Sequence, residues 1–194
     1  MPEGKLIVVV GPSGVGKRTL IKHVLSHMPQ CWFSVSATTR QPRAGEVDGA
    51  DYHFMSGEAF RTSIRKDGFL EYEEFAGENF YGTPRMPVEM RLLAGDHVIA
   101  ELEVKGALKV KALLPRTETI FIVPPEPMIE TLRQRILERG GVSPESLERR
   151  LKTAQEELAQ EHLFDHHVVN DELSVAQNEM LWRVRKILKE PAMA

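Results

Sequence analysis

The clearest signal in this chain is the segment Gly11-Pro12-Ser13-Gly14-Val15-Gly16-Lys17-Arg18-Thr19. It follows the unbroken apolar run Leu6-Ile7-Val8-Val9-Val10, which is typical of a buried central parallel strand. Apolar residues then recur at helical spacing at Leu20, Ile21, Val24, Leu25 and Met28. A strand, a glycine loop and a helix start in this order predict a phosphate cradle, because the loop N–H groups and the positive end of the helix both favour an anion. The alternative is an ordinary glycine-rich turn, against which the correct flanks on both sides argue.

The last residues of this loop set its expected chemistry. Lys17 is placed to reach the outer phosphates of a nucleoside triphosphate. The pattern asks next for Ser or Thr, whose hydroxyl binds Mg²⁺, but this chain has Arg18 there. Thr19 follows one residue later, turned about 100° around the helix. We therefore predict a nucleotide cradle in which protein ligation of the metal is weakened.

Composition limits the class of protein. The 194 residues suffice for one domain with a substantial core. A net charge of −3 gives no reason to expect nucleic acid or a membrane surface as a partner, and no apolar run approaches the length of a membrane span. The single cysteine, Cys31, excludes an internal disulfide, as is usual in a reducing compartment. Because the first strand begins close to Met1, we expect no signal or transit peptide and a cytoplasmic location.

Residues 34–52 form a second informative segment, rich in hydroxyl groups and carrying Arg40 and Arg43. Arginine side chains suit a bidentate grip on a phosphate monoester, and a tyrosine hydroxyl adds a further donor. The alternative is a polar surface loop. In the same chain as a phosphate cradle, the segment predicts a second phosphate site, and so one phosphate donor and one phosphate acceptor.

The spacing Ser-x-x-x-Arg-x-x-Arg-x-Gly-Glu-x-x-Gly-x-Asp-Tyr, coming after the glycine loop, resembles the guanylate kinases. The resemblance extends from about residue 5 to about residue 186. It implies that residues 34–84 bind GMP and that Glu46 is the acid that orients the two arginines. The side chains that it assigns to the GMP phosphate are Ser36, Arg40, Arg43 and Tyr52.

The same resemblance implies contacts to the base. Glu71 would face the N1–H and 2-amino groups of guanine, Thr83 would reach O6, and Tyr81 would touch the phosphate. A carboxylate accepts from both guanine donors, whereas adenine would leave buried polar groups unpaired at about 1–3 kcal/mol each. The alternative for Glu71 is an outward charge on an alternating strand.

Residues 98–104 predict a second central strand with two acids inside it, Glu101 and Glu103. Carboxylates two residues apart share one face of a strand, where they suit an Mg²⁺ ion or nucleobase N–H groups at the carboxyl end of the sheet. The resemblance places both acids near GMP. Glu101 matches bacterial members, whereas Glu103 stands where Asp is usual and Lys105 where Gln is usual.

Two charged helices are predicted at residues 128–139 and 144–162. Arg135 and Arg139 lie four apart on one face, which favours an anion arriving from outside, although Arg139 also complements a helix C-terminus. The resemblance makes Arg135, Arg139 and Arg150 lid arginines that close over the triphosphate.

The end of the chain predicts a last strand within residues 164–171 and a final helix. The resemblance places Asn170 near the donor nucleotide. Ser174 and Gln177 predict a capping box at the start of the helix, and Ser143 predicts a cap for the preceding one.

Alternating strands and helices predict a three-layer α/β fold, with a parallel sheet and helices on both faces. We expect a core domain of residues 1–33, 85–124 and 164–194, a GMP-binding region of residues 34–84 and a lid of residues 125–163. The implied reaction is ATP + GMP to ADP + GDP, with dGMP as a further acceptor, by in-line transfer without a covalent enzyme intermediate. ATP would be bound by the loop of residues 11–19 and Asn170. The residues expected to act in catalysis are Lys17, Arg40, Arg43, Arg135, Arg139 and Arg150.

Two other functions stay open at this point: an interaction module with this fold but no turnover, and a kinase of a phosphorylated sugar. The intact Lys17 loop argues against the first. Glu71 and Thr83 argue against the second, because a sugar phosphate offers them no base edge. The expected partners are ATP, GMP and Mg²⁺ carried by ATP, and the sequence leaves the oligomeric state open.

Replacing Arg18 with serine restores the hydroxyl that the loop pattern asks for. We expect Arg18→Ser to lower the Mg²⁺ requirement at fixed ATP and to leave acceptor selectivity unchanged, because the wild-type ion is held mainly by the triphosphate, with Glu101 and Glu103 as the nearby acids. A Mg²⁺ titration of the initial rate measures this. An unchanged titration would show that Thr19 or another group already supplies the ligand.

Overall fold

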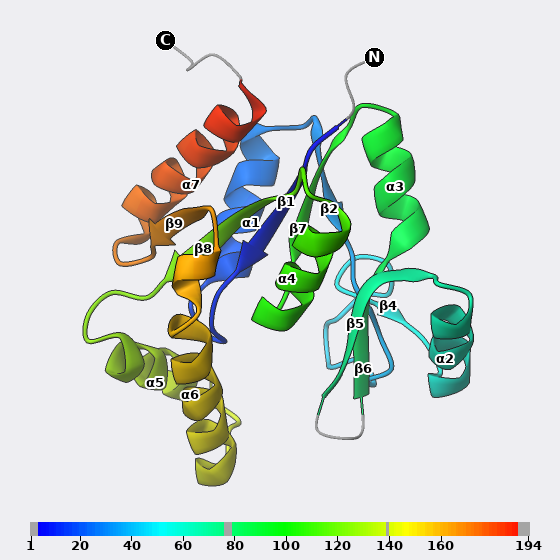
Figure 1. The fold of residues 1–194 in the computed structure, drawn as a ribbon. Helices are drawn as coiled ribbons and strands as arrows, with labels where there is room; N and C mark the ends of the chain where they lie inside the picture. The colour runs from blue at the N-terminus through cyan, green and yellow to red at the C-terminus, as the bar shows by residue number, and fades with distance from the viewer. Residues whose placement is uncertain (1–3, 76–78, 139, 190–194) are drawn as a thin grey trace.

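A five-stranded parallel sheet forms the centre of the computed structural model, which describes residues 4–75, 79–138 and 140–189 (Figure 1). The strand order is β2-β7-β1-β8-β9, and every neighbouring pair is parallel. The strands are β1 (Leu6–Val10), β2 (Cys31–Ser34), β7 (His97–Glu101), β8 (Glu118–Val123) and β9 (His166–Val169). The prediction of a parallel α/β sheet is confirmed.

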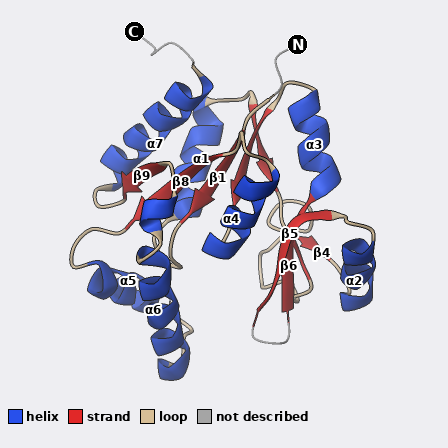
Figure 2. Ribbon diagram, viewed as in Figure 1, coloured by secondary structure: helices blue, strands red, loops and turns tan. Residues whose placement is uncertain are grey.

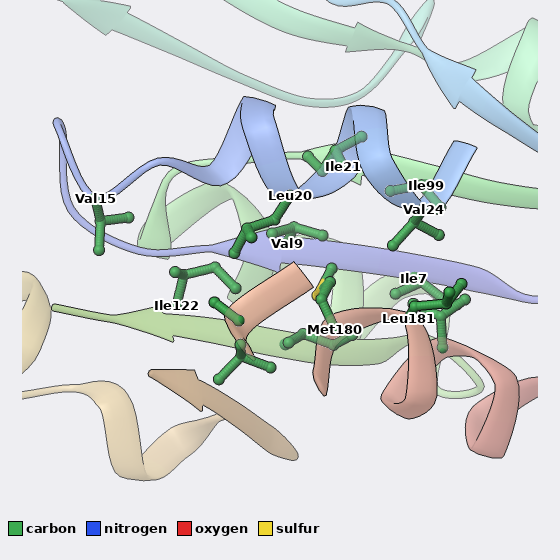
Figure 3. Packing of buried hydrophobic residues seen from close by; sticks show 14 of the residues in the cluster. Ile7, Val9, Val15, Leu20, Ile21, Val24, Ile99, Ile122, Met180 and Leu181 are labelled. Atoms are coloured by element: carbon green, nitrogen blue, oxygen red, sulfur yellow. The ribbon is translucent and has the colours of Figure 1, made fainter. Parts of the chain in front are cut away.

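The central strand β1 separates two hydrophobic cores, because its side chains alternate between the two faces of the sheet. Ile7 and Val9 belong to the first core, together with Leu20, Val24 and Met180 from two helices (Figure 3). Leu6, Val8 and Val10 belong to the second core. All five residues of β1 are buried.

Helices cover both faces of this sheet (Figure 2). On the side of the first core lie α1 (Lys17–His27) and α7 (Leu173–Leu188). On the side of the second core lie α3 (Arg85–Leu93) and α4 (Val104–Leu113). No helix in the described part of the chain is long and apolar enough to cross a membrane.

A second, mixed sheet lies beside the central one, with strand order β4-β3-β6-β5. Its members are β3 (Ala37–Thr38), β4 (His53–Phe54), β5 (Phe69–Phe75) and β6 (Asn79–Pro84). The helix α2 (Gly57–Arg65) packs on it through Phe60, whose ring stacks on Phe69 at a centroid distance of 4.3 Å. These residues and Ala37 form a small core separate from the other two.

The helices α5 (Met128–Glu138) and α6 (Pro144–Leu158) lie next to each other at the carboxyl edge of the sheet, and the short 3₁₀-helix η1 (Glu161–Leu163) follows them. Arg133 of α5 is paired with Glu148 of α6 at 2.8 Å. Both helices bury apolar residues in the first core: Leu132, Ile136, Leu147, Leu151 and Ala154. The predicted cap is confirmed, since the Ser143 hydroxyl accepts from the N–H of Ser146 at 3.3 Å.

Two local predictions are wrong. The strand β7 ends at Glu101, and Glu103 is the N-cap of α4, so the two acids do not share one face of a strand. The sequence hides this change, because Leu102 and Val104 continue the alternation of a strand, while Val104 already begins the helical spacing that buries Ala107 and Val110.

The second error concerns the start of α7. The helix begins at Leu173 with the extended residue Glu172 as its N-cap, and no side chain caps it. Ser174 therefore lies inside the first helical turn and cannot form the predicted capping box with Gln177. The first buried residue of α7 is Ala176, so the apolar spacing does not show at which residue of the preceding turn the helix begins.

Candidate functional site

The loop of residues 11–16 leaves β1 at the middle of the sheet and leads directly into α1. Gly14 and Gly16 have φ angles of 91° and 99°, which residues with a Cβ rarely adopt. A Cβ on Gly16 would also collide with the side-chain amide of Asn170. Glycine is thus required at position 16 both by the backbone conformation and by the close approach of the Asn170 side chain.

Lys17 lies inside this loop and is only 8% exposed. Its ammonium group donates to the carbonyl oxygen of Gly11 at 2.6 Å. The carboxylate of Glu101, at the end of the neighbouring strand β7, lies 3.8 Å from the same Nζ atom. Lys17 and Glu101, a predicted cation and a predicted acid of the site, therefore lie together at the carboxyl edge of the sheet.

Asn170 and Arg135 fix the loop from its outer side. The Asn170 amide donates to the carbonyl oxygen of Val15 at 2.7 Å. Arg135 of α5 donates to the carbonyl oxygens of Asn170 at 2.9 Å and of Val15 at 3.5 Å. These contacts join α5 and the end of β9 to the loop, where both residues were predicted to meet the donor nucleotide.

A pocket of about 350 Å³ opens at this outer side. Its walls come from the loop, from α5 and from the turn between β9 and α7: Gly14, Val15, Gly16, Arg135, Glu138, Asn170, Asp171 and Leu173. A larger pocket of about 550 Å³ lies between residues 126–130 and α6. None of the predicted site residues lines it.

Arg18 points across the site instead of continuing outward from α1. Its guanidinium group lies 3.5 Å from Asp51 Oδ1 and 3.9 Å from Glu101 Oε2. It also lies over the ring of Phe33, 4.6 Å from the centroid. The hydroxyl-bearing neighbour, Thr19, is exposed.

A second cluster gathers the residues predicted for the acceptor phosphate. Arg40 donates to Glu46 Oε1 at 2.8 Å, and Glu46 Oε2 accepts the backbone N–H of Arg43 at 2.7 Å. These hydrogen bonds hold the pKa of Glu46 below its usual range. The guanidinium of Arg40 lies 5.4 Å from the ring centroid of Tyr52, and that ring lies 6.0 Å from the ring of Tyr81.

Burial raises the pKa of the Tyr52 hydroxyl, and the nearby Glu101 carboxylate raises it further. Tyr52 therefore stays a neutral hydrogen-bond donor. The side chains of two other predicted residues lie nearer the surface of this cluster: Ser36 is half-buried, and Arg43 exposes its side chain.

Glu71 and Thr83 face each other across β5 and β6, and Thr83 Oγ1 donates to Glu71 Oε1 at 2.7 Å. Both are buried, with 8% and 1% exposure, so Glu71 is not an outward charge on an alternating strand. Burial raises the pKa of Glu71. A Cβ on Gly106 of α4 would stand 2.7 Å from Glu71 Oε2, so glycine is needed there for the carboxyl group to fit.

Glu103 has an unexpected neighbour, the buried Glu157 of α6, and its carboxylate raises the pKa of that residue. Two neighbouring carboxylates repel each other unless one of them carries a proton. Burial, followed by the contact with Glu103, raises the pKa of Glu157 to about 9, and the charge of Lys17 opposes this rise.

Two predicted lid arginines remain. Arg150 lies exposed on α6. Arg139 lies outside the described residues.

Two residues of the site were missed in the sequence. Asp51 precedes Tyr52 in the quoted motif, but nothing in the spacing pairs it with Arg18. Glu157 carried a clearer signal, because it continues the buried stripe of Leu147, Leu151 and Ala154 on α6. An acid on that stripe is either buried or in contact with a site.

The chain matches the family described as guanylate kinase over residues 3–190. A guanylate kinase of Desulfitobacterium hafniense (strain Y51) is 49% identical over 178 residues, covering 92% of this chain and 88% of that protein. A guanylate kinase of Synechocystis sp. is 46% identical over 179 residues, covering 92% of each.

Two solved structures resemble this chain, and one of them is a guanylate kinase. The crystal structure of guanylate kinase from Anaplasma phagocytophilum has a TM-score of 0.76 at 30% identity and covers 97% of this chain and 86% of that one. A sugar kinase structure from Janibacter sp. HTCC2649, 20% identical with a TM-score of 0.51, shares the fold alone.

Replacing Glu157 with glutamine tests the carboxyl pair. A carboxyl group whose pKa is raised on folding holds a proton that the unfolded chain has lost, so the free energy of unfolding falls as pH rises from about 4.5 towards 9. We expect Glu157→Gln to raise the free energy of unfolding by about 1–3 kcal/mol at pH 8 and by much less at pH 5.

Urea unfolding at the two pH values measures this difference, with Glu156→Gln on the exposed side of α6 as the matched control. Equal effects of Glu157→Gln at pH 5 and pH 8 would contradict the raised pKa of Glu157.

Proposed function

The chain belongs to the guanylate kinase family and phosphorylates GMP with ATP, and we propose that two groups of residues divide these substrates between them. The first group surrounds the loop of residues 11–19 and holds ATP. The second lies on the mixed sheet and holds GMP. Both groups lie at the carboxyl edge of β1 and β7, where ligands of open α/β sheets usually bind.

The donor group acts through fixed positive charge. Loop N–H groups and the start of α1 face the phosphates, and Lys17 is held at the mouth of the loop by the Gly11 carbonyl. Arg135 is already placed against the loop by its contacts with Asn170 and Val15. We assign Arg150 and Arg139 to the same lid, as cations that neutralise the triphosphate when it is bound.

The acceptor group is carried by the buried pair of Glu71 and Thr83, and this is the observation on which the proposal depends. A partly desolvated carboxyl and hydroxyl group side by side match the N1–H, 2-amino and O6 groups of guanine. Arg40, Tyr52 and Tyr81 form the phosphate end of the same site, with Ser36 and Arg43 at its border.

Transfer follows an in-line path from ATP to the GMP phosphate, and the protein contributes positioning and charge neutralisation. Lys17 stabilises the charge that develops on the transferred group, and Arg40 holds the attacking phosphate. Neither step needs a covalent bond to the enzyme. Tyr52, kept neutral by its raised pKa, donates a hydrogen bond to the acceptor phosphate without repelling it.

Magnesium fits this site as its ATP complex. Among the described residues, no group of three or more His, Cys, Asp or Glu side chains could hold an ion alone. Glu101 is the carboxylate at the mouth of the loop, beside both Lys17 and Arg18. It suits a water-mediated contact, and the bound ion would neutralise the charge of the triphosphate.

Acceptor choice tests this function. GMP should be favoured over AMP by at least about 10³ in kcat/KM, because adenine leaves several buried polar groups unpaired. A coupled assay of ADP release across nucleoside monophosphates measures this ratio. Glu71→Gln should lower kcat/KM for GMP by about 10² or more, while the control Glu74→Gln, on the exposed part of the same strand, should not. Comparable rates with AMP or CMP would overturn the assignment.

The phosphate clamp gives a separate test. Arg40→Ala or Arg43→Ala should each lower kcat/KM for GMP by about 10² or more, because a charge-assisted contact to the acceptor phosphate is lost. The affinity for ATP, measured by titration calorimetry, should barely change. If ATP affinity fell in parallel with GMP turnover, the division into two sites would be wrong.

A further inference from the structure

Arg18 occupies the loop position where a metal-binding hydroxyl is usual, and its side chain connects two parts of the fold. The residue belongs to α1, on the central sheet. Its guanidinium lies 3.5 Å from Asp51, in the segment between β3 and β4 of the mixed sheet. It also reaches Glu101 at the end of β7 at 3.9 Å. One side chain at the end of the donor loop thus contacts both the central sheet and the acceptor segment.

Phe33 of β2 supports the orientation of Arg18, because its ring centroid lies 4.6 Å from the guanidinium carbon. Stacking on an aromatic face leaves the N–H groups at the edge of the guanidinium free to meet carboxylates. Arginine is suited to this position, whereas a serine or threonine would be too short to reach Asp51.

Asp51 connects Arg18 to the acceptor cluster through hydrogen bonds within its own turn. Its other carboxylate oxygen, Oδ2, accepts the backbone N–H of Val47 at 3.0 Å, and its own N–H donates to the Val47 carbonyl at 2.9 Å. The turn is closed by the N–H of Gly49, which donates to the carbonyl of Tyr52 at 2.8 Å. The carboxylate of Asp51 therefore fixes the turn that presents the next residue, Tyr52.

We propose that Arg18 is a positioning residue that fastens the acceptor segment to the donor loop through Asp51, and so places Tyr52 for the phosphate of GMP. This role rests on the proposed function of the two sites. It takes the place of metal ligation at this loop position. Because the two side chains are partly exposed, the pair changes the apparent affinity for GMP by only a few fold.

A double-mutant cycle tests the pair. Arg18→Met and Asp51→Asn should each raise KM for GMP about 3–5-fold, and the double variant should raise it no further, since both changes break one contact. Asp51→Asn should leave KM for ATP within about twofold of wild type, and Arg18→Met should change KM for GMP more than KM for ATP. Arg18→Lys should recover part of the loss, because it restores the charge but not the planar group. Lys22→Met, which removes an exposed positive charge from the same helix, is the matched control.

Multiplying effects in the double variant would show that the two residues act independently and would overturn the role of Arg18. An equal rise in KM for ATP and GMP would also overturn it, since it would place Arg18 on the donor side. Wild-type turnover of GMP is measured first. Its absence would overturn the proposed function and this role together, whereas intact turnover without coupling overturns the role alone.

Discussion

The complete burial of β1 is the constraint from which the site follows. A strand covered on both faces and paired on both edges has its carboxyl end in the middle of the sheet, so the chain can continue only over that edge. The next residues must return at once to the first core, because Leu20, Ile21 and Val24 are buried there. The short reversal between these demands needs glycine, and it leaves a ring of backbone N–H groups at the start of a helix.

Positively and negatively charged side chains alternate at this edge of the sheet. The cations Lys17 and Arg18 face Glu101 between them, and Arg18 also faces Asp51. At Glu157, burial and the neighbouring Glu103 carboxylate raise the pKa against the opposing charge of Lys17, so the acid tends to hold its proton. Both arrangements avoid an unpaired buried charge, which would cost several kcal/mol.

The sequence predicts the loop well because its chemistry is local: strand, glycines, lysine and helix adjoin one another in the chain. The family resemblance assigned Glu71 and Thr83 each to the same base, and the strand register explains why the structure brings them together. Glu103 was misplaced because Leu102 and Val104 continue the alternating pattern of the strand into the start of the helix. The contacts of Arg18 with Asp51 and of Glu103 with Glu157 join segments distant in the chain, and no periodicity or spacing encodes them.

Two ion pairs link the mixed sheet to the central part of the fold, and they bear on how the acceptor site works. On one side Asp51 meets Arg18, and on the other Glu73 of β5 meets Lys109 of α4 at 2.6 Å, with Leu70 as the apolar contribution. The mixed sheet keeps its own small core. Partly exposed ion pairs exchange readily with water, so such a junction resists displacement less than an apolar interface of equal size. A segment that must admit one nucleotide and release another, while still presenting Tyr52 accurately, is better served by a few directional contacts than by a fused core.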